Sequence, residues 1–585
     1  MNAAFDQIAG FASSAPLSRS SLRRDQNRKL MAGLYMRGSR ALREWGYGTW
    51  LYAHRLKGRH PVQILGSPDD PAPGNATLGS AIFGGDMLHG GEQVPISETF
   101  WQDISKASLQ FQRYAHSYHW LQDLAQTNDQ VKARDAAETI IGWWLPTAKD
   151  WNKGSWEAET LARRMINWLA HAPLILSSRD LVYRSAILHS MACQTRHLMR
   201  THSDAPAGLP QVYTATALML AGLLLPGGSH WLEKGSKVLQ KAIKGFILPD
   251  GGPASRNTAD AIRTMQLLIM VRSAIIDTNN DMPPWVQVSL DRMAPFVRTM
   301  RHGDGSFAQI GGVSAEGGHG TDAILAASEA KGKAIENAAH TGIQRLQMRT
   351  SCVIMDCGTP PVPYLSQRSH ASTGSFEFSN GQDRIIVNMG PASTNGPLAQ
   401  LAKLSRTTAA HSTLVISDRN SSRIMEDGRV GKGVTETLTI REGLAVHEEQ
   451  KGGARIKLMH DGYLKRFGVK HERALQLDAN GKRLVGSDKL YGPKLKKLRG
   501  ETVLLRFHLH PQIEALLAPD GRISLETRSG KIWIFDVPDC TAEIEGSLYL
   551  AQPDSPVATR QIVVRIPVVE NETPICNWVL SEMDT

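Results

Sequence analysis

Two histidines in the second half of the chain lie beside strand-like runs, with an arginine and several hydroxyl residues between them. His370 lies in SHASTGSFEFSNGQDRIIVNMG and His411 in SRTTAAHSTLVISD, each beside a strand-like run, with Arg406 between them. Histidine changes its protonation state near neutral pH, and β-strands hold side chains in fixed positions. The segment therefore predicts a polar site on the face of a β-sheet.

The chain around these histidines has the pattern of strands. After Gly303, short β-branched runs such as STLVISD, TVLLRFHLHP and RQIVVRIPVV are separated by Gly, Asp, Asn or Pro turns. This pattern predicts an antiparallel β-sandwich of about a dozen strands.

The residues from Phe100 to about Thr299 have a helical period instead. In WEAETLARRMINWLAHAPLIL, apolar residues recur three and four positions apart, as at Leu161, Met165 and Trp168. Several such runs end in Pro or Gly turns, and consecutive helices joined by short loops pack as antiparallel pairs. The pattern predicts an incomplete α/α toroid.

A chain of 585 residues is too long for one hydrophobic core. We therefore expect an α+β multidomain protein. Its parts are an N-terminal extension and lead-in segment over 1–98, the α/α toroid over 99–302 and the antiparallel β-sandwich over 303–585.

Composition and charge limit the partners. Apolar residues make up 41% and charged residues 21%, which is typical of a folded protein, and a net charge of +10 suits a polyanionic sugar or a soluble surface. Because no zinc-finger spacing, helix-turn-helix or dense basic block is present, we expect no nucleic acid partner. The five cysteines fit free buried thiols better than a disulfide framework.

The N-terminal sequence lacks the continuous apolar segment of a secretory signal. The longest apolar run, Thr214 to Pro226, is too short to span a bilayer. We therefore expect no membrane span and a cytoplasmic location, with the periplasm as the alternative, while the oligomeric state stays open.

The order and spacing of four short motifs resemble the heparinase II/III family of polysaccharide lyases. The motifs are His370-Ala371-Ser372, Ser375-Phe376-Glu377-Phe378, Ile386-Val387-Asn388-Met389-Gly390 and His411-Ser412-Thr413-Leu414. The resemblance implies an α/α toroid followed by a β-sandwich, with the site between them. It also implies β-elimination on a uronate-containing acidic polysaccharide or oligosaccharide.

The resemblance includes a departure at the family's metal site. Zinc-containing members hold the metal with His, Asp and His, and the matching positions here are Ser372, Asn388 and His411. Serine and asparagine are poor zinc ligands. We therefore expect neither zinc nor another cofactor.

β-Elimination requires a base for the proton next to the uronate carboxylate, groups that neutralise this carboxylate, and an acid for the leaving oxygen. By its match to the family, His370 is the expected base. Arg256 and Asn257, which follow an Asp-Gly turn, are the candidate clamp, and Tyr463 is the candidate acid. The tyrosine that family members carry after this turn is not identifiable here.

Further residues are candidates for contacting the glycan through charge, amide groups or stacking: Arg163, Arg164, Asn167, Trp168, Asn388, Arg406 and His411. Structural interpretations stay open for several of them. Trp168 fits core packing equally well, and His411 suits a structural role at the former metal position. Arg256 and Asn257 could simply mark the start of a helix, because asparagine is a good N-cap residue.

Two other functional classes stay open. One is a non-catalytic carbohydrate-binding relative of the lyases, which the missing zinc ligands and toroid tyrosine favour. The other is a glycoside hydrolase on the same scaffold, which needs two carboxylic acids across a cleft. The available acids are Glu157, Glu159, Asp250 and Asp260.

Overall fold

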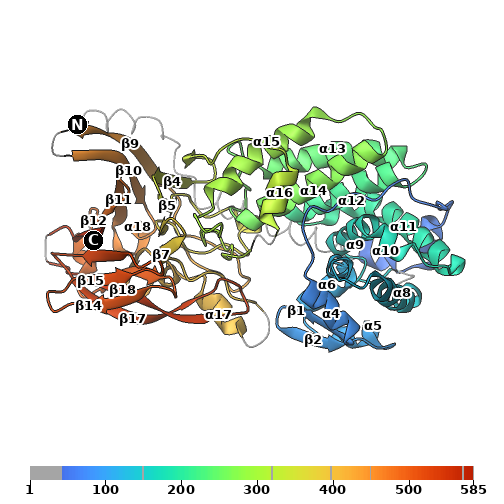
Figure 1. Cartoon of the computed structure of the whole chain (residues 1–585), viewed down its shortest axis with the longest axis horizontal. Helices are drawn as coiled ribbons and strands as arrows, with labels where there is room; N and C mark the ends of the chain where they lie inside the picture. Colours follow the sequence, from blue (N-terminus) through green and yellow to red (C-terminus); the bar gives the residue numbers. More distant parts are fainter. Residues whose placement is uncertain are drawn as a thin grey trace, which may run out of the picture.

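The computed structural model of the protein describes residues 43–147, 151–317, 320–394, 398–447, 450–569 and 572–583. Residues 1–42 lie outside this range, and with them the first part of the predicted N-terminal extension and the expected absence of a secretory signal. Figure 1 shows two regions next to each other, a helical region in blue to green and a β region in yellow to red.

The helical region consists of helices joined by turns, with a two-stranded sheet near its start. Its elements are α3 (Trp50–Leu56), α4 (Ala76–Phe83), β1 (Asp86–His89), β2 (Glu92–Pro95), α5 (Phe100–Asp103), α6 (Leu109–Ser117), α7 (Trp120–Ala125), α8 (Gln130–Thr147), α9 (Ala158–Ala170), α10 (Ala172–Ile175), α11 (Leu181–Thr201), α12 (Leu209–Leu224), α13 (Ser229–Phe246), α14 (Thr258–Asp277), α15 (Pro284–Thr299) and α16 (Thr321–Ala327).

Helix α12 is the centre of the helical region. It is buried on nearly all sides and packs against α9, α13 and α14. Helix α13 buries only one face, with Trp231, Gly235 and Leu239 four positions apart. A Cβ at Gly222 of α12 would overlap the backbone of Leu232 in α13, so glycine permits the close contact between these helices.

The β region contains two short helices and the strands of a sandwich. Its elements are β3 (Asn337–Ala338), β4 (Ile343–Met348), β5 (Ser351–Asp356), β6 (Phe376–Asn380), β7 (Asp383–Val387), α17 (Ala399–Leu404), β8 (Leu414–Ile416), β9 (Thr437–His447), β10 (Gln450–His460), α18 (Leu464–Phe467), β11 (Lys470–Asp478), β12 (Arg483–Tyr491), β13 (Val503–Leu509), β14 (Glu514–Leu517), β15 (Ile523–Glu526), β16 (Ile532–Asp536), β17 (Thr541–Tyr549), β18 (Val557–Ile566) and β19 (Ile575–Glu582).

These strands form two antiparallel sheets. One sheet has eight strands in the order β14-β15-β16-β19-β12-β11-β10-β9. The other has nine, in the order β17-β18-β13-β7-β6-β5-β4-β3 with β8 paired to β13. Aromatic side chains join the two sheets: Phe376 of β6 and Phe507 of β13 lie 5.7 and 4.9 Å from Trp578 of β19, measured between ring centroids. Such contacts stabilise the sandwich and fix the spacing of its sheets.

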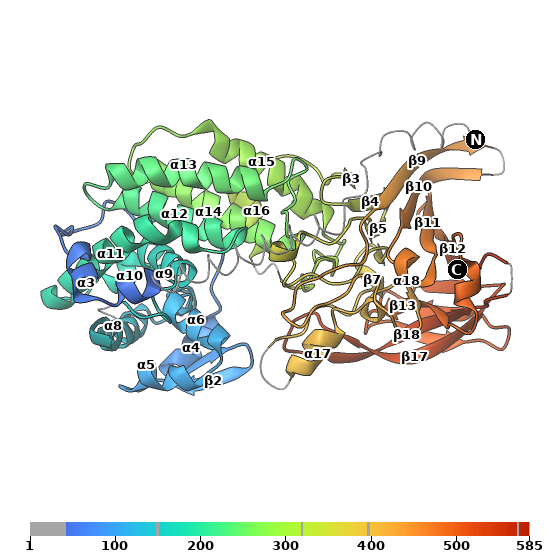
Figure 2. The same cartoon turned by 180° about the vertical axis from the view of Figure 1, so that it is seen from behind.

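The helical and β regions meet at one end of the inner helices, which are α9, α12 and α14. Gly208, just before α12, lies against Leu365, and Thr394 donates a hydrogen bond to Gln110 of α6 over 3.4 Å. Figure 2 shows this arrangement from behind, with the helical region now on the left. The N-terminal end of α12 therefore points towards the sandwich.

The predicted fold class, an incomplete α/α toroid followed by an antiparallel β-sandwich, is confirmed. The change from helices to strands comes later than the expected residue 302. Helix α16 lies beyond that point, and Phe307, Ile310 and Ile324 belong to the core of the helical region. None of the described helices combines the length and the apolar character that a bilayer crossing requires.

Candidate functional site

His370 and His411 lie in contact in the sandwich, and both are neutral at pH 7. Burial lowers the pKa of His370 well below its usual value, and electrostatic interactions with His411 and Arg406 act in the same direction. Burial also lowers the pKa of His411 to about 4. Each ring therefore carries a single proton.

Hydrogen bonds fix where these two protons lie. Nδ1 of His411 is 2.7 Å from the carbonyl oxygen of Thr407, and its Nε2 is 3.1 Å from Nδ1 of His370. A carbonyl oxygen can only accept, so His411 donates through Nδ1 and accepts at Nε2 from His370. Nε2 of His370 is left unprotonated, and no described residue donates a hydrogen bond to it. His370 thus has the form that a general base needs.

The three positions that match the family's zinc ligands do not fit a metal. The hydroxyl of Ser372 donates to Asp356 over 2.7 Å, and both nitrogens of His411 are engaged as above. The amide of Asn388 donates to Glu377 over 3.0 Å, while its oxygen accepts from the backbone N–H of Ser412 over 2.9 Å. The side chains of Ser372, Asn388 and His411 are therefore all hydrogen-bonded to other protein groups. Asn388 is held inside the sandwich, where it does not face a glycan.

Arg406 supports the loop that carries His370. Its guanidinium donates to the carbonyl oxygen of Ser369 over 2.9 and 2.7 Å and also to that of Gly428. Because these backbone contacts occupy the side chain, the structure gives Arg406 a positioning role in place of the expected contact with substrate.

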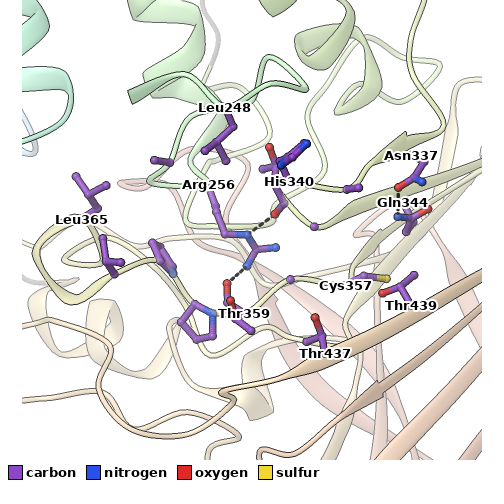
Figure 3. Close-up of a pocket in the computed structure, with 18 of the residues that line it drawn as sticks. Leu248, Arg256, Asn337, His340, Gln344, Cys357, Thr359, Leu365, Thr437 and Thr439 are labelled. Carbon is purple, nitrogen blue, oxygen red and sulfur yellow. Dashed lines mark hydrogen bonds between the residues drawn. The ribbon is translucent and has the colours of Figure 1, made fainter. Parts of the chain in front are cut away.

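Arg256 joins the toroid to the sandwich. Its guanidinium donates to the carbonyl oxygens of Thr341 and Thr359 over 2.7 and 3.1 Å. Figure 3 shows the bond to Thr359. The remaining terminal nitrogen of Arg256 forms a buried ion pair with Asp356. All three nitrogens of the guanidinium therefore have protein partners. None is free to bind a substrate carboxylate, so the expected role of Arg256 as a carboxylate clamp is wrong.

Asn257 caps the helix that follows it. Its side-chain oxygen accepts from the backbone N–H of Ala259 over 3.0 Å, and its amide donates to the carbonyl oxygen of Gly312 over 3.1 Å. This is the structural alternative that the sequence left open, so the clamp role is corrected for Asn257 as well.

Tyr463 is in the wrong place for the expected acid. Its side chain is only 1% exposed and packs beside Phe467 in the core of the sandwich. Its hydroxyl donates to the carbonyl oxygen of Leu414 over 2.8 Å, and burial raises its pKa. The side chain therefore anchors a turn.

Arg164 and Trp168 are also structural. Arg164 is completely buried and donates to Gln194 over 2.8 Å and to the carbonyl oxygens of His116 and Ser155. Trp168 is completely buried against other aromatic rings, such as that of Trp144, 5.5 Å away between centroids. Neither side chain can contact a glycan in this fold.

The other two residues expected on this helix, Arg163 and Asn167, line a small pocket among the inner helices. Residues of α9, α12 and α14 and one adjoining turn meet here: Arg163, Asn167, Tyr213, Arg263, Gln266 and His119. The free volume of about 20 Å³ suits one small polar group.

The charged groups that line this pocket are Arg163, Arg263 and the carboxylate of Asp70. The guanidinium of Arg163 lies 3.9 Å from the centroid of the Tyr213 ring and pairs with Glu159. Burial works to lower the pKa of Arg163, but Tyr213 and Glu159 outweigh this and raise it, so the side chain stays a cation. Arg263 donates through Nη1 to Gln266 over 2.5 Å, and its Nε and Nη2 have no hydrogen-bond partner among the described residues. Its charge helps to lower the pKa of Asp70, against the larger effect of burial, which raises it.

His119 adds a neutral imidazole to the pocket. Burial lowers its pKa well below the usual value, and the charges of Arg263 and Arg163 lower it further. An uncharged His119 leaves Arg163 and Arg263 as the cations of the pocket, beside the carboxyl group of Asp70.

Arg368 and Gly312 connect this pocket with His370. Arg368 forms an ion pair with Asp260 at the start of α14, and Asp260 acts electrostatically on Arg163. Gly312 lies against both the carbonyl oxygen of Arg368 and the imidazole of His370. His370 and the toroid pocket therefore lie at the same end of the inner helices.

Sequence reasoning missed Tyr213, Arg263 and His119. Tyr213 lies in LPQVYTATALMLAGLLLP, an apolar run that is typical of a core helix. The one signal in the sequence was that Tyr213 carries a polar hydroxyl and lies one turn after the start of this apolar helix. Arg263 and His119 are distant from Tyr213 in sequence and approach it only when the toroid closes. No short motif therefore contains all three residues.

Comparison with known proteins agrees with the fold. A model of the heparinase II/III-like C-terminal domain matches residues 330–579. This part of the chain belongs to the heparinase II/III-like family. Solved structures with this fold extend the likeness to the toroid, although their identities are low enough to show the fold alone.

Two of these structures cover most of both chains. A heparinase III has 15% identity and a TM-score of 0.61, covering 82% of this chain and 78% of its own. The heparan sulfate lyase of Pedobacter heparinus has 14% identity and a TM-score of 0.58, covering 96% and 90%.

A curated protein that is not named as a lyase is more similar to this chain in sequence than these two structures are. It is the FtsZ-localized protein C of Caulobacter vibrioides, 28% identical over 495 residues that span 82% of this chain and 83% of the relative. This similarity extends beyond the heparinase II/III-like domain.

Proposed function

We propose that the protein cleaves a uronate-containing acidic glycan by β-elimination at the junction of toroid and sandwich. The observation that carries this proposal is the hydrogen-bond chain from Thr407 through His411 to His370, which leaves Nε2 of His370 unprotonated. Arg163 and Arg263 at the same end of the inner helices supply the positive charge that a uronate carboxylate requires.

In the proposed reaction, Nε2 of His370 takes the proton from the carbon next to the carboxylate. The electron pair of that C–H bond forms the new C=C bond as the C–O bond to the leaving sugar breaks, and the leaving oxygen takes the proton of the Tyr213 hydroxyl. Nε and Nη2 of Arg263 neutralise the carboxylate. Arg163 above the Tyr213 ring stabilises the negative charge that this tyrosine gains. Transfer of a proton from His370 to Tyr213 through solvent restores the site.

Hydrolysis has less support, because the candidate carboxylates are committed to partners. The pairs are Glu157 with Arg113, Glu159 with Arg163, Asp250 with Thr341, and Asp260 with Ser255 and Arg368. A hydrolase needs one carboxylic acid that donates a proton and one that activates water or attacks. The described contacts favour elimination.

The test is incubation with a panel of uronate-containing polysaccharides and oligosaccharides, read by the absorbance of the unsaturated uronate and by new reducing ends. We expect both signals from at least one glycan. Reducing ends without the absorbance would mean hydrolysis, and binding without either would mean a carbohydrate-binding module. Each of these outcomes overturns the proposed reaction.

Variants assign the roles. His370→Ala and Tyr213→Phe should each lower kcat about 10²–10⁴-fold, the usual contribution of general acid–base catalysis. Exposed His230→Ala and Tyr364→Phe are the matched controls and should leave the rate unchanged. Full activity of His370→Ala, in a protein with wild-type circular dichroism, would remove this residue from the mechanism.

We also propose, as a second candidate function, that the protein associates with FtsZ. The similarity to FtsZ-localized protein C supports this, because it spans both the toroid and the sandwich, whereas the family model covers only residues 330–579. Purified protein should co-sediment with FtsZ polymers from the same organism and remain in solution without them. Absence of co-sedimentation over a range of salt concentrations would refute this candidate and leave the lyase proposal untouched.

A further inference from the structure

The long strand β9 ends one sheet of the sandwich. Among the strands that the structure describes, β9 pairs only with β10, and in the other sheet β3 pairs only with β4. Figure 1 shows β9 and β10 as a hairpin along the upper edge of the β region. An edge strand carries unpaired backbone N–H and C=O groups, which can accept another extended chain.

Two pockets adjoin this edge, one on each face of β9. The inner pocket has a volume of about 730 Å³ and is lined by Thr437, Thr439 and Arg441 of β9 together with Tyr364 and Asn337. Figure 3 shows Thr437 and Thr439 on one side of it and Asn337 and Gln344 on another. Side chains on one face of an added strand could therefore enter this space.

The outer pocket, of about 300 Å³, has an apolar floor and a charged rim. Leu438 and Ile440 of β9, Met459 of β10 and Tyr491 of β12 contribute to it, and Lys489 lies at its rim. Leu438 is 50% and Ile440 41% exposed, which is unusual for two neighbouring aliphatic residues on one strand face. The alternate side chains of an added strand would meet this second pocket.

The charge around the outer pocket identifies the kind of partner. Cross-strand pairing puts the residues opposite Leu438, Ile440 and Glu442 on the same face of the sheet. Cations outnumber carboxylates there: Arg455, Lys457, Lys470 and Lys489 stand against Glu442 and Glu472. Lys457 pairs with Glu472, and Lys489 has no ion-pair partner among the described residues.

We propose that β9 is a docking edge for an acidic, extended peptide segment of a partner protein. The segment pairs with the β9 backbone as an additional strand, places an apolar side chain in the outer pocket and sets its carboxylates against Lys457 and Lys489. The inner pocket takes the side chains of the opposite face. The two pockets beside β9 do not include His370 and share no lining residue with the toroid pocket, although the inner one reaches Arg256 at the junction of toroid and sandwich.

The test uses the full-length protein and a displayed library of random peptides 11 residues long, the length of β9. We expect selection of acidic peptides with bulky apolar residues at alternate positions. In complex with a selected peptide, the backbone amides of Thr437 to Glu442 should gain protection from hydrogen exchange.

Variants of both edges of the sheet make the test specific. Ile440→Ser and the double variant Lys457→Ser/Lys489→Ser should each weaken binding of the selected peptide at least about tenfold, which corresponds to about 1.4 kcal/mol. The matched control is Leu516→Ser on β14, the opposite edge of the same sheet, where Leu516 is 66% exposed. It should not change the affinity.

Three results would overturn the proposal. The first is no enrichment of acidic peptides, and the second is binding that Ile440→Ser leaves intact. The third is a dimer of the wild-type protein in light scattering that Ile440→Ser converts to a monomer, because the edge would then accept a second copy of the chain.

Discussion

Replacing Arg256 by methionine tests whether one buried ion pair holds the toroid and the sandwich together. Arg256 precedes α14, and its partner Asp356 ends β5 in the sandwich. The side chain of Arg256 is 9% exposed and that of Asp356 is 0% exposed. Methionine keeps most of the volume and removes the charge and every hydrogen bond.

The expected loss of stability follows from the buried groups that lose their partner when Arg256 is replaced. Asp356 would keep its bonds from Ser372 and Gly358 but would be a buried carboxylate without a counter-ion. The carbonyl oxygens of Thr341 and Thr359 would also lose their donor. Removing one partner of a buried ion pair costs about 3–5 kcal/mol. Because each 1.4 kcal/mol is a factor of ten, the folding equilibrium should fall by about two to nearly four orders of magnitude.

The assay is urea unfolding followed by circular dichroism and tryptophan fluorescence. Arg429→Met is the control, because Arg429 also pairs with an aspartate, Asp427, but the two side chains are 46% and 44% exposed. Exposed ion pairs contribute about 0–1 kcal/mol, so this variant should unfold close to the wild type.

A double variant separates the ion pair from the packing. Arg256→Met combined with Asp356→Asn leaves no buried charge and should be more stable than Arg256→Met alone. A loss below about 1 kcal/mol for Arg256→Met, or a double variant less stable than the single one, would refute the reasoning.

Three further predictions concern stability and pH. Burial works to raise the pKa of Glu377, but Arg384 and His302 outweigh it and lower the pKa to about 2, so unfolding free energy should fall as pH decreases from about 4.5 to about 2. Glu377→Gln should flatten this pH dependence in urea titrations, and an unchanged slope would contradict it. Gly222→Ala should cost about 1–3 kcal/mol through overlap with α13, whereas Gly142→Ala in α8, with open space around it, should stabilise by about 0.5–1 kcal/mol, as thermal unfolding can measure. Dialysis against a chelator should leave the melting temperature unchanged, since the residues at the former zinc position bond to protein groups; a drop reversed by zinc would oppose this.

The architecture could be predicted because helical and strand periods differ over long stretches of the chain. Trp168 and its spacing from Leu161 and Met165 indicated a buried helix face, and the structure buries all three. The same periodicity could not separate a core arginine from a ligand-binding one. Arg163 and Arg164 are neighbours in sequence, yet one lines the pocket and the other is sealed in the core.

The candidate site was harder to predict because closure of the fold creates it. His370 and His411 could be paired in advance, since both flank strands of one short segment. Arg256 and Tyr463 were misassigned because sequence does not reveal that backbone carbonyls already occupy their donors. Tyr213 could not be found from its neighbours, because its polar partners come from other helices.

The N-terminal end of α12, which points towards the sandwich, has an electrostatic consequence that does not depend on any side chain. The aligned peptide dipoles of a helix act as about half a positive elementary charge at its N-terminus. The start of α12 therefore adds to the attraction that Arg163 and Arg263 exert on anions. Capture of a polyanion by this field should be fast in dilute buffer and slow steeply with added salt, while a neutral oligosaccharide should show no such dependence.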